Sequence, residues 1–181
     1  SNIVTQLHLP VQSGSDNILK RMNRHYSVEK YKDLLQYCRE KIDGITITTD
    51  IIVGFPGETE EDFQQTLQLL KDVRYDMAFT FIYSKRSGTP AAEFEEQVPE
   101  EVKRVRLQAL MEVQNEISLE LNQAMEGKVY DIIVEGPSRT DENMWFGRTS
   151  GNKMVLFPKQ ENLKVGDTID VRIDKGQTWV L

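Results

Sequence analysis

The stretch from Ile45 to Asp62 constrains the fold more than any other part of the sequence. Ile45 to Val53 is rich in isoleucine and threonine, which is typical of a buried strand, and it ends at a sharp turn, Gly54 to Glu58. Thr59 to Asp62 then forms a variant capping box, with acidic side chains in the first turn of a helix. A strand that enters a helix through so short a turn indicates a βα unit.

The same alternation continues on both sides. Ile3 to Leu9 is a predicted strand, Ser15 is a predicted N-cap of a short helix, and Ser27 to Gly44 is an amphipathic helix whose apolar stripe includes Cys38. Met77 to Tyr83 is a further strand. This order predicts parallel strands joined by right-handed crossovers, with helices on the sheet faces. The expected fold class is therefore α/β.

The pattern changes toward the end of the chain. A long amphipathic helix is predicted from Pro99 to about Gly127, where a glycine suits a left-handed cap. Short β-branched runs then follow, at Val129–Val134, Met144–Arg148, Lys153–Phe157, Thr168–Ile173 and Thr178–Leu181. Five short strands predict a small closed barrel of the oligonucleotide-binding type. We assign one domain to residues 1–124 and a second to residues 125–181.

Composition excludes several classes of protein. The chain has 22 Lys and Arg against 29 Asp and Glu, a net charge of −7, which argues against nucleic-acid binding by bulk charge alone. Apolar runs fall far short of the roughly 20 residues that span a bilayer, so we expect a soluble cytoplasmic protein. The single cysteine, Cys38, excludes a disulfide framework or a multi-cysteine iron–sulfur site made by these residues alone.

Three loops follow predicted strands, where parallel α/β folds place their binding residues. His8 to Ser15 offers hydroxyl and amide groups for a ligand such as a ribose, and Asp50 to Glu58 joins an apolar strand end to two glycines, which suits a flat heterocycle. Tyr83 to Pro90 is basic and rich in hydroxyls, which suits a carboxylate or phosphate. Each loop alone also fits a structural role, as a helix start, a tight turn or a solvated loop.

Other candidate residues have simple structural explanations. His8 and His25 lack metal-ligand spacing, Cys38 fits a small core residue, and Glu93 to Glu101 fits a solvated face with helix N-terminal charge. In the predicted barrel, aromatic and basic side chains either bind single-stranded RNA or belong to the barrel itself. These residues are Arg139, Trp145, Phe146, Arg148, Lys153, Phe157 and Lys159.

The loops are more specific together than singly. The combined pattern is His8 to Ser15, Lys20 to Met22, Asp50 to Thr59, Tyr83-Ser84 and Gly88 to Ala92. It resembles the radical SAM methylthiotransferases over nearly the whole chain. Within that family, the first loop and the segments Val134 to Gly136, Gly147 to Thr149 and Asn152 most resemble the enzymes that methylthiolate N6-isopentenyladenosine beside the tRNA anticodon.

The resemblance implies the C-terminal half of a radical SAM (TIM-like, partial) β/α barrel followed by a TRAM barrel that binds the tRNA anticodon arm. S-adenosylmethionine would lie across the barrel mouth, held by Gln12, Ser13, Val53, Gly54, Phe55, Pro56, Tyr83 and Ser84. The substrate or RNA would meet Arg86, Trp145, Arg148 and Lys153. Glu58 stands one place late for the family's Gly-x-Ile-x-Gly-x-x-Glu pattern, so we assign it no cofactor contact.

The family's reaction requires parts that this sequence lacks. Its members hold two 4Fe-4S clusters on six cysteines, and a deoxyadenosyl radical abstracts hydrogen from the adenine ring before sulfur and then a methyl group are added. We therefore expect the chain to be a piece of a longer polypeptide with no catalytic residues and no metal ligands of its own, inactive by itself. Its unpaired first strand should favour self-association, which light scattering would detect.

Two rival interpretations remain open. The first is a ribosomal-protein methylthiotransferase, which shares the Ile52 to Thr59 stretch but differs in the first loop. The second is a non-catalytic RNA-binding module, in which the barrel binds RNA and the three loops are only turns.

Overall fold

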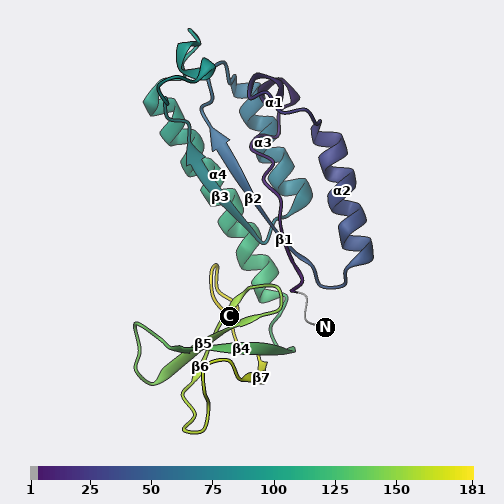
Figure 1. Cartoon of the computed structure of the whole chain (residues 1–181), viewed down its shortest axis with the longest axis vertical. Coiled ribbons are helices and arrows are strands. Elements are labelled where there is room, and N and C mark those ends of the chain that lie inside the picture. Colours follow the sequence, from purple (N-terminus) through teal and green to yellow (C-terminus); the bar gives the residue numbers. More distant parts are fainter. Residues whose placement is uncertain (1–3) are drawn as a thin grey trace. The chain divides into compact units, whose positions relative to one another are not determined.

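The computed structural model describes residues 4–181, so Ile3 of the first predicted strand lies outside the described residues. Residue contacts divide the chain into two compact units. The α/β unit consists of residues 8–41 and 47–117, and the β unit consists of residues 4–7, 42–46 and 118–181. Figure 1 gives the element labels used below.

Three strands form the sheet that begins the chain, in the order β1-β2-β3. Strands β2 and β3 are parallel, in register from Thr48 opposite Met77 to Val53 opposite Ile82, which confirms the α/β prediction. The barrel arrangement stays a prediction. The elements are β1 (Gln6–His8), α1 (Asp16–Arg21), α2 (Val28–Lys41), β2 (Thr46–Val53), α3 (Glu60–Val73), β3 (Met77–Ile82), η1 (Pro90–Glu93) and α4 (Glu100–Gln123).

The two faces of this sheet differ in burial. On β2, Ile47, Ile51 and Val53 are fully buried. The residues of β2 that alternate with these three point to the other face of the sheet. Cross-strand partners share a face, so their partners on β3 lie there too and are open to solvent. Phe79 and Phe81 on that face are 46% and 51% exposed. The sheet therefore has one helix-covered face and one open apolar face.

Local sequence signals set the starts of α1 and α3. The Ser15 hydroxyl accepts a hydrogen bond from the Ile18 N–H, and Thr59 and Asp62 form a complete capping box. Asp62 joins the two helix starts, because its carboxylate also accepts the Ser15 hydroxyl at 2.5 Å. Both predicted caps are confirmed.

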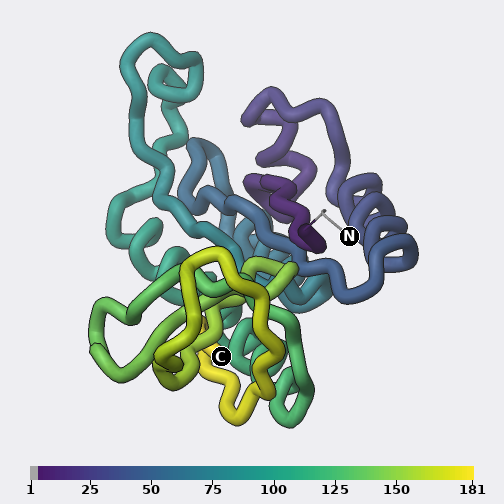
Figure 2. The backbone as a smooth tube through the Cα atoms, turned by 60° about the horizontal axis from the view of Figure 1, so that its bottom comes forward, coloured from purple at the N-terminus to yellow at the C-terminus, as the bar shows by residue number. Residues whose placement is uncertain are grey.

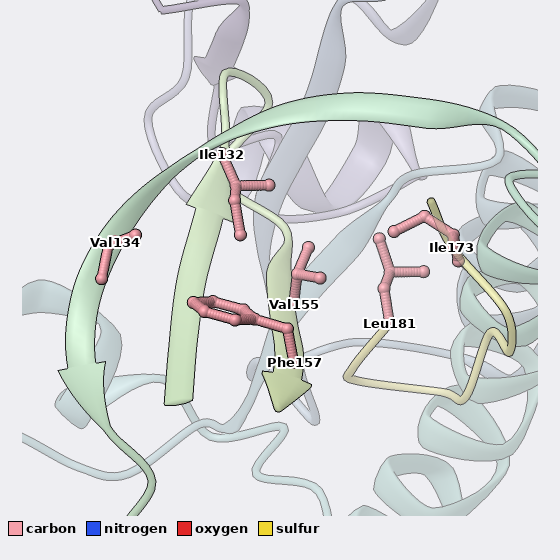
Figure 3. Close-up of a cluster of buried hydrophobic side chains, with 6 residues drawn as sticks. All are labelled: Ile132, Val134, Val155, Phe157, Ile173 and Leu181. Atoms are coloured by element: carbon pink, nitrogen blue, oxygen red, sulfur yellow. The ribbon is translucent and has the colours of Figure 1, made fainter. Parts of the chain in front are cut away.

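The β unit contains a curled four-stranded antiparallel sheet in the order β6-β5-β4-β7. Its strands are β4 (Val129–Pro137), β5 (Met144–Thr149), β6 (Met154–Pro158) and β7 (Thr168–Arg172). A register shift between Val134 and Gly136 interrupts β4, and such bulges bend a strand. Figure 3 shows β4 curving over the buried cluster formed by Ile132, Val134, Val155, Phe157, Ile173 and Leu181.

The fifth predicted strand, Thr178–Leu181, is wrong. Only Leu181 pairs with β6, donating to the Met154 carbonyl and accepting from the Leu156 N–H, both at 2.9 Å. The preceding residues turn instead, because the Gln177 N–H donates to the Val180 carbonyl.

Two predicted helix stripes are also partly wrong. On α2 the fully covered residues are Tyr31 and Leu35, while Leu34 is 48% exposed and Cys38 is only half-buried. The reason is that the covered side of this helix is narrower than its apolar stripe. On α4 the predicted positions Leu110 and Ile117 are buried, but Val102 and Val105 are exposed, and the other buried positions carry polar side chains. These are Lys103, Arg106, Gln114, Ser118 and Asn122.

Within residues 4–181, no helix combines the length and apolarity that membrane crossing needs.

Replacing Asp62 by Ala should lower the free energy of unfolding by about 1–3 kcal/mol, because one buried carboxylate caps α3 and binds Ser15. Burial alone would raise the pKa of Asp62, but hydrogen bonds from Ser15, Thr59 and Asn17 outweigh it and lower that pKa below the ordinary 3.8. The charged carboxylate therefore stabilises the fold above about pH 4, and this contribution disappears as the pH falls through the lowered pKa. Urea unfolding at neutral and acid pH measures both effects, with exposed Asp33→Ala as the control; equal losses for the two variants would contradict the prediction.

Candidate functional site

A cavity of about 530 Å³ lies where β2 and β3 end. Each of the three predicted loops contributes to its wall: Gln12 from the first, Phe55 from the second, and Tyr83, Ser84 and Arg86 from the third. The remaining lining residues are Met22, Arg24, Asp50, Ile52, Phe81, Ile82, Thr89 and Ala91. Apolar and aromatic walls with a few polar groups are typical of small-molecule sites, and a nucleoside has matching chemistry.

Four of the predicted cofactor residues do not line this cavity: Ser13, Val53, Gly54 and Pro56 are buried beside it. Asp50 and Ile52 belong to the second predicted loop but were given no contact of their own, and Phe81 was missed; all three reach the cavity from the open face of the sheet. The available signal was strand alternation, since Ile52 stands opposite Phe81 in the register.

The backbone of Gln12 is held in an unusual conformation. Its φ of 72° is left-handed, which is uncommon for a residue other than glycine. Two hydrogen bonds to β2 fix it there, from the Gln12 N–H to the Asp50 carbonyl and from the Ile52 N–H to the Gln12 carbonyl, both at 2.9 Å. Such strain is characteristic of functional sites, and here it directs a glutamine to the cavity wall.

The neighbouring residues of the first loop have structural roles. Ser13 is fully buried, and its hydroxyl accepts the Ser15 N–H at 3.1 Å and lies 3.4 Å from the Thr66 hydroxyl. Gly14 permits a close helix contact, because a Cβ there would lie 2.5 Å from the Thr66 Cα atom. The Gly14 N–H donates to the Thr66 hydroxyl at 2.9 Å.

The second loop is closed by a buried carboxylate. The Gly54 N–H donates to Glu58 Oε1 at 2.8 Å, and Arg106 of α4 donates to the same oxygen at 2.8 Å and to the Glu58 carbonyl at 3.1 Å. Burial raises the pKa of Glu58, while the Gly54 N–H and the Arg106 guanidinium act in the opposite direction. Glu58 therefore holds the turn together and does not line the cavity.

Tyr83 joins the second and third loops. Its N–H donates to the Val53 carbonyl at 2.9 Å, and its ring meets Phe55 edge-on with 5.1 Å between ring centroids. The Tyr83 hydroxyl is buried and has no hydrogen-bond partner among residues 4–181. A buried hydroxyl without a partner is unfavourable, so a ligand that hydrogen-bonds to it would gain affinity.

The β unit has its own cavity, of about 570 Å³. Phe146 and Leu156 are cross-strand partners on the outer face of β5 and β6, and Arg148 pairs there with Met154. Arg148 also forms an ion pair with Glu135 at 3.2 Å. The other lining residues are Ser138, Arg139, Thr140 and Val180. An apolar floor with arginines and hydroxyls beside it fits a nucleobase and its sugar-phosphate.

Of the aromatic and basic residues that the sequence marks in this unit, Arg139, Phe146 and Arg148 line this cavity. Trp145 packs against the buried cluster of Figure 3, and Lys153 donates to the Asn122 side-chain oxygen at 2.8 Å.

Residues 4–181 contain no group of three or more His, Cys, Asp or Glu side chains that could hold a metal ion. They therefore do not fit the ligand set of an iron–sulfur cluster.

Comparison with known proteins adds two domain matches. Residues 1–70 match the radical SAM superfamily, and residues 123–181 match the TRAM domain. The chain is 57% identical over 179 residues to a tRNA-2-methylthio-N(6)-dimethylallyladenosine synthase of Carboxydothermus hydrogenoformans, covering 99% of the chain and 40% of that relative. Relatives with the same name from Acetivibrio thermocellus and Natranaerobius thermophilus are 54% and 51% identical, and 37% and 40% of their length is covered. The chain thus spans about two fifths of these relatives.

Ser13→Ala should lower the free energy of unfolding by about 1 kcal/mol, because it removes the buried acceptor of the Ser15 N–H. Chemical denaturation of this variant and of exposed Ser87→Ala provides the comparison. The structural role is refuted if Ser13→Ala unfolds at the same denaturant concentration as the unmodified chain.

Proposed function

Because the chain belongs to the radical SAM methylthiotransferase family, we propose that it supplies the S-adenosylmethionine cavity and the RNA-binding unit of a tRNA-modifying enzyme. This enzyme adds a methylthio group to the adenine ring of N6-isopentenyladenosine beside the tRNA anticodon. The observation that carries this proposal is that residues of all three predicted loops line one cavity. The names of the relatives support the tRNA nucleoside as substrate.

The residues of the α/β cavity suit S-adenosylmethionine. Ile52, Phe55 and Phe81 offer apolar surface to an adenine, and the free Tyr83 hydroxyl and the Gln12 amide offer hydrogen bonds. When bound, S-adenosylmethionine supplies the radical and methyl-transfer chemistry. The residues of this chain bind it, orient it and shield it from water. No cluster ligands and no catalytic residues are assigned to the chain.

The cavity of the β unit suits single-stranded RNA of the anticodon arm. Phe146 and Leu156 offer a surface on which a base can stack, and Arg139 and Arg148 offer charge to phosphates. Residues 128–181 carry eight basic and eight acidic side chains, so affinity would depend on these local contacts. Arg86, at the cavity of the α/β unit, is proposed to meet the substrate.

A chimaeric enzyme tests the proposal. The matching region of the Carboxydothermus hydrogenoformans relative is replaced by this chain, and modified nucleosides and ribosomal proteins are analysed by mass spectrometry. Methylthiolated isopentenyladenosine is expected. Product on ribosomal protein alone would support the rival substrate class. A chimaera that binds tRNA but not S-adenosylmethionine would support a non-catalytic RNA-binding module.

Phe81→Ala should weaken S-adenosylmethionine binding by the chimaera by about tenfold, because aromatic stacking on a base contributes about 1–3 kcal/mol. Phe79→Ala is the matched control, since Phe79 lies on the same open face but does not line the cavity. Calorimetry measures both, and equal losses would contradict the assignment of the cavity.

Arg148→Ala should weaken binding of an anticodon stem-loop and reduce its salt dependence, because one phosphate contact is lost. Arg172→Ala is the matched control: Arg172 is also paired with a carboxylate, Asp174 at 3.1 Å, but lies outside the cavity lining. Filter binding at several salt concentrations distinguishes them. An effect of Arg172→Ala as large as that of Arg148→Ala would indicate a general charge effect.

A further inference from the structure

Two buried cations of α4 lie beneath the loops that line the α/β cavity. The Lys103 side chain is 4% exposed and that of Arg106 is 7% exposed, although both residue types are normally on the surface. They are three positions apart and therefore lie on the same side of the helix. Neither is among the residues that line the cavity.

Lys103 contacts both walls. Its ammonium donates to the Glu100 carboxylate at 2.7 Å and to the Tyr83 carbonyl at 3.2 Å, and it lies 5.5 Å from the centre of the Tyr83 ring. Its aliphatic stem lies against Gly54, where a Cβ atom would collide with it. The loop after β2 and the loop after β3 are therefore both fixed to one side chain.

Arg106 fixes the far end of the second loop. It donates to the carboxylate and to the carbonyl of Glu58, and this carboxylate accepts the Gly54 N–H. The Glu58 side chain is 1% exposed, so the pair is shielded from solvent. Removing one partner of such a pair leaves a buried charge uncompensated, which makes Arg106 a poor position for a test.

We propose that Lys103 is a positioning residue of the cavity: its ammonium and stem together set the separation between the Gly54 turn and the Tyr83 wall. Arg106 acts with it by closing the turn on Glu58. This role adds no step to the reaction in the cavity. Its expected effect on S-adenosylmethionine binding rests on the proposed function.

The first experiment needs no substitution. In the unmodified chain labelled with ¹⁵N-lysine, the Lys103 ammonium should give a slowly exchanging signal, because it is buried and hydrogen-bonded. The exposed Lys175 should give none. A Lys103 signal that exchanges as fast as that of Lys175 would overturn the proposal.

The second experiment compares Lys103→Met with Arg104→Met, an exposed position on the same helix. Methionine keeps an unbranched stem but removes the ammonium. Amide exchange at Gly54 and Tyr83 should rise about fivefold or more in Lys103→Met only, while amides of the β unit stay unchanged. A uniform increase over all amides, or none, would show that Lys103 contributes only general stability.

The third measurement links the position to binding. In the chimaera, Lys103→Met should weaken S-adenosylmethionine binding several-fold and leave stem-loop affinity unchanged. If local exchange rises but S-adenosylmethionine affinity does not change, the positioning role stands and the assignment of the cavity ligand fails. If local exchange does not rise, the positioning role itself fails.

Discussion

The α/β cavity depends on the burial of charge beneath its loops. Glu58 and Arg106 form an ion pair shielded from solvent, and Lys103 is buried one turn away on the same helix. Burying charges is unfavourable unless they are paired and hydrogen-bonded, and here the partners are the carboxylates of Glu58, Glu60 and Glu100 together with backbone groups of the loops. The Gly54 N–H, the Glu58 carbonyl and the Tyr83 carbonyl all take part. The loops are thus held by the same contacts that make the buried charges tolerable.

The cavity unites features that are distant in the sequence. Gln12 reaches it through a left-handed backbone conformation fixed by β2, and Phe55 and Tyr83 meet edge-on above the ends of β2 and β3. The third loop leaves the sheet and returns to begin α4, as the teal segment of Figure 2 illustrates. One helix therefore both follows the third loop and anchors the second.

Sequence reasoning succeeded where the signal was local. The Ser15 cap and the Thr59–Asp62 capping box were predicted correctly, because both depend on residues within one helical turn. It failed where burial depends on tertiary contacts. Near its start, the buried side of α4 carries Lys103 and Arg106, so a search for apolar periodicity selected the exposed Val102 and Val105 instead. Cavity residues such as Phe81 depend on sheet register, and Leu181 pairs with β6 without forming a strand.

The central claim is that residues of three loops form one nucleoside-binding cavity. A crystal structure of the chimaeric enzyme with S-adenosylmethionine would test it most directly. The claim predicts that the adenosine moiety contacts Gln12, Phe55 and Tyr83 at the same time. Adenosine bound at any other place, with these three side chains in contact only with solvent, would contradict it.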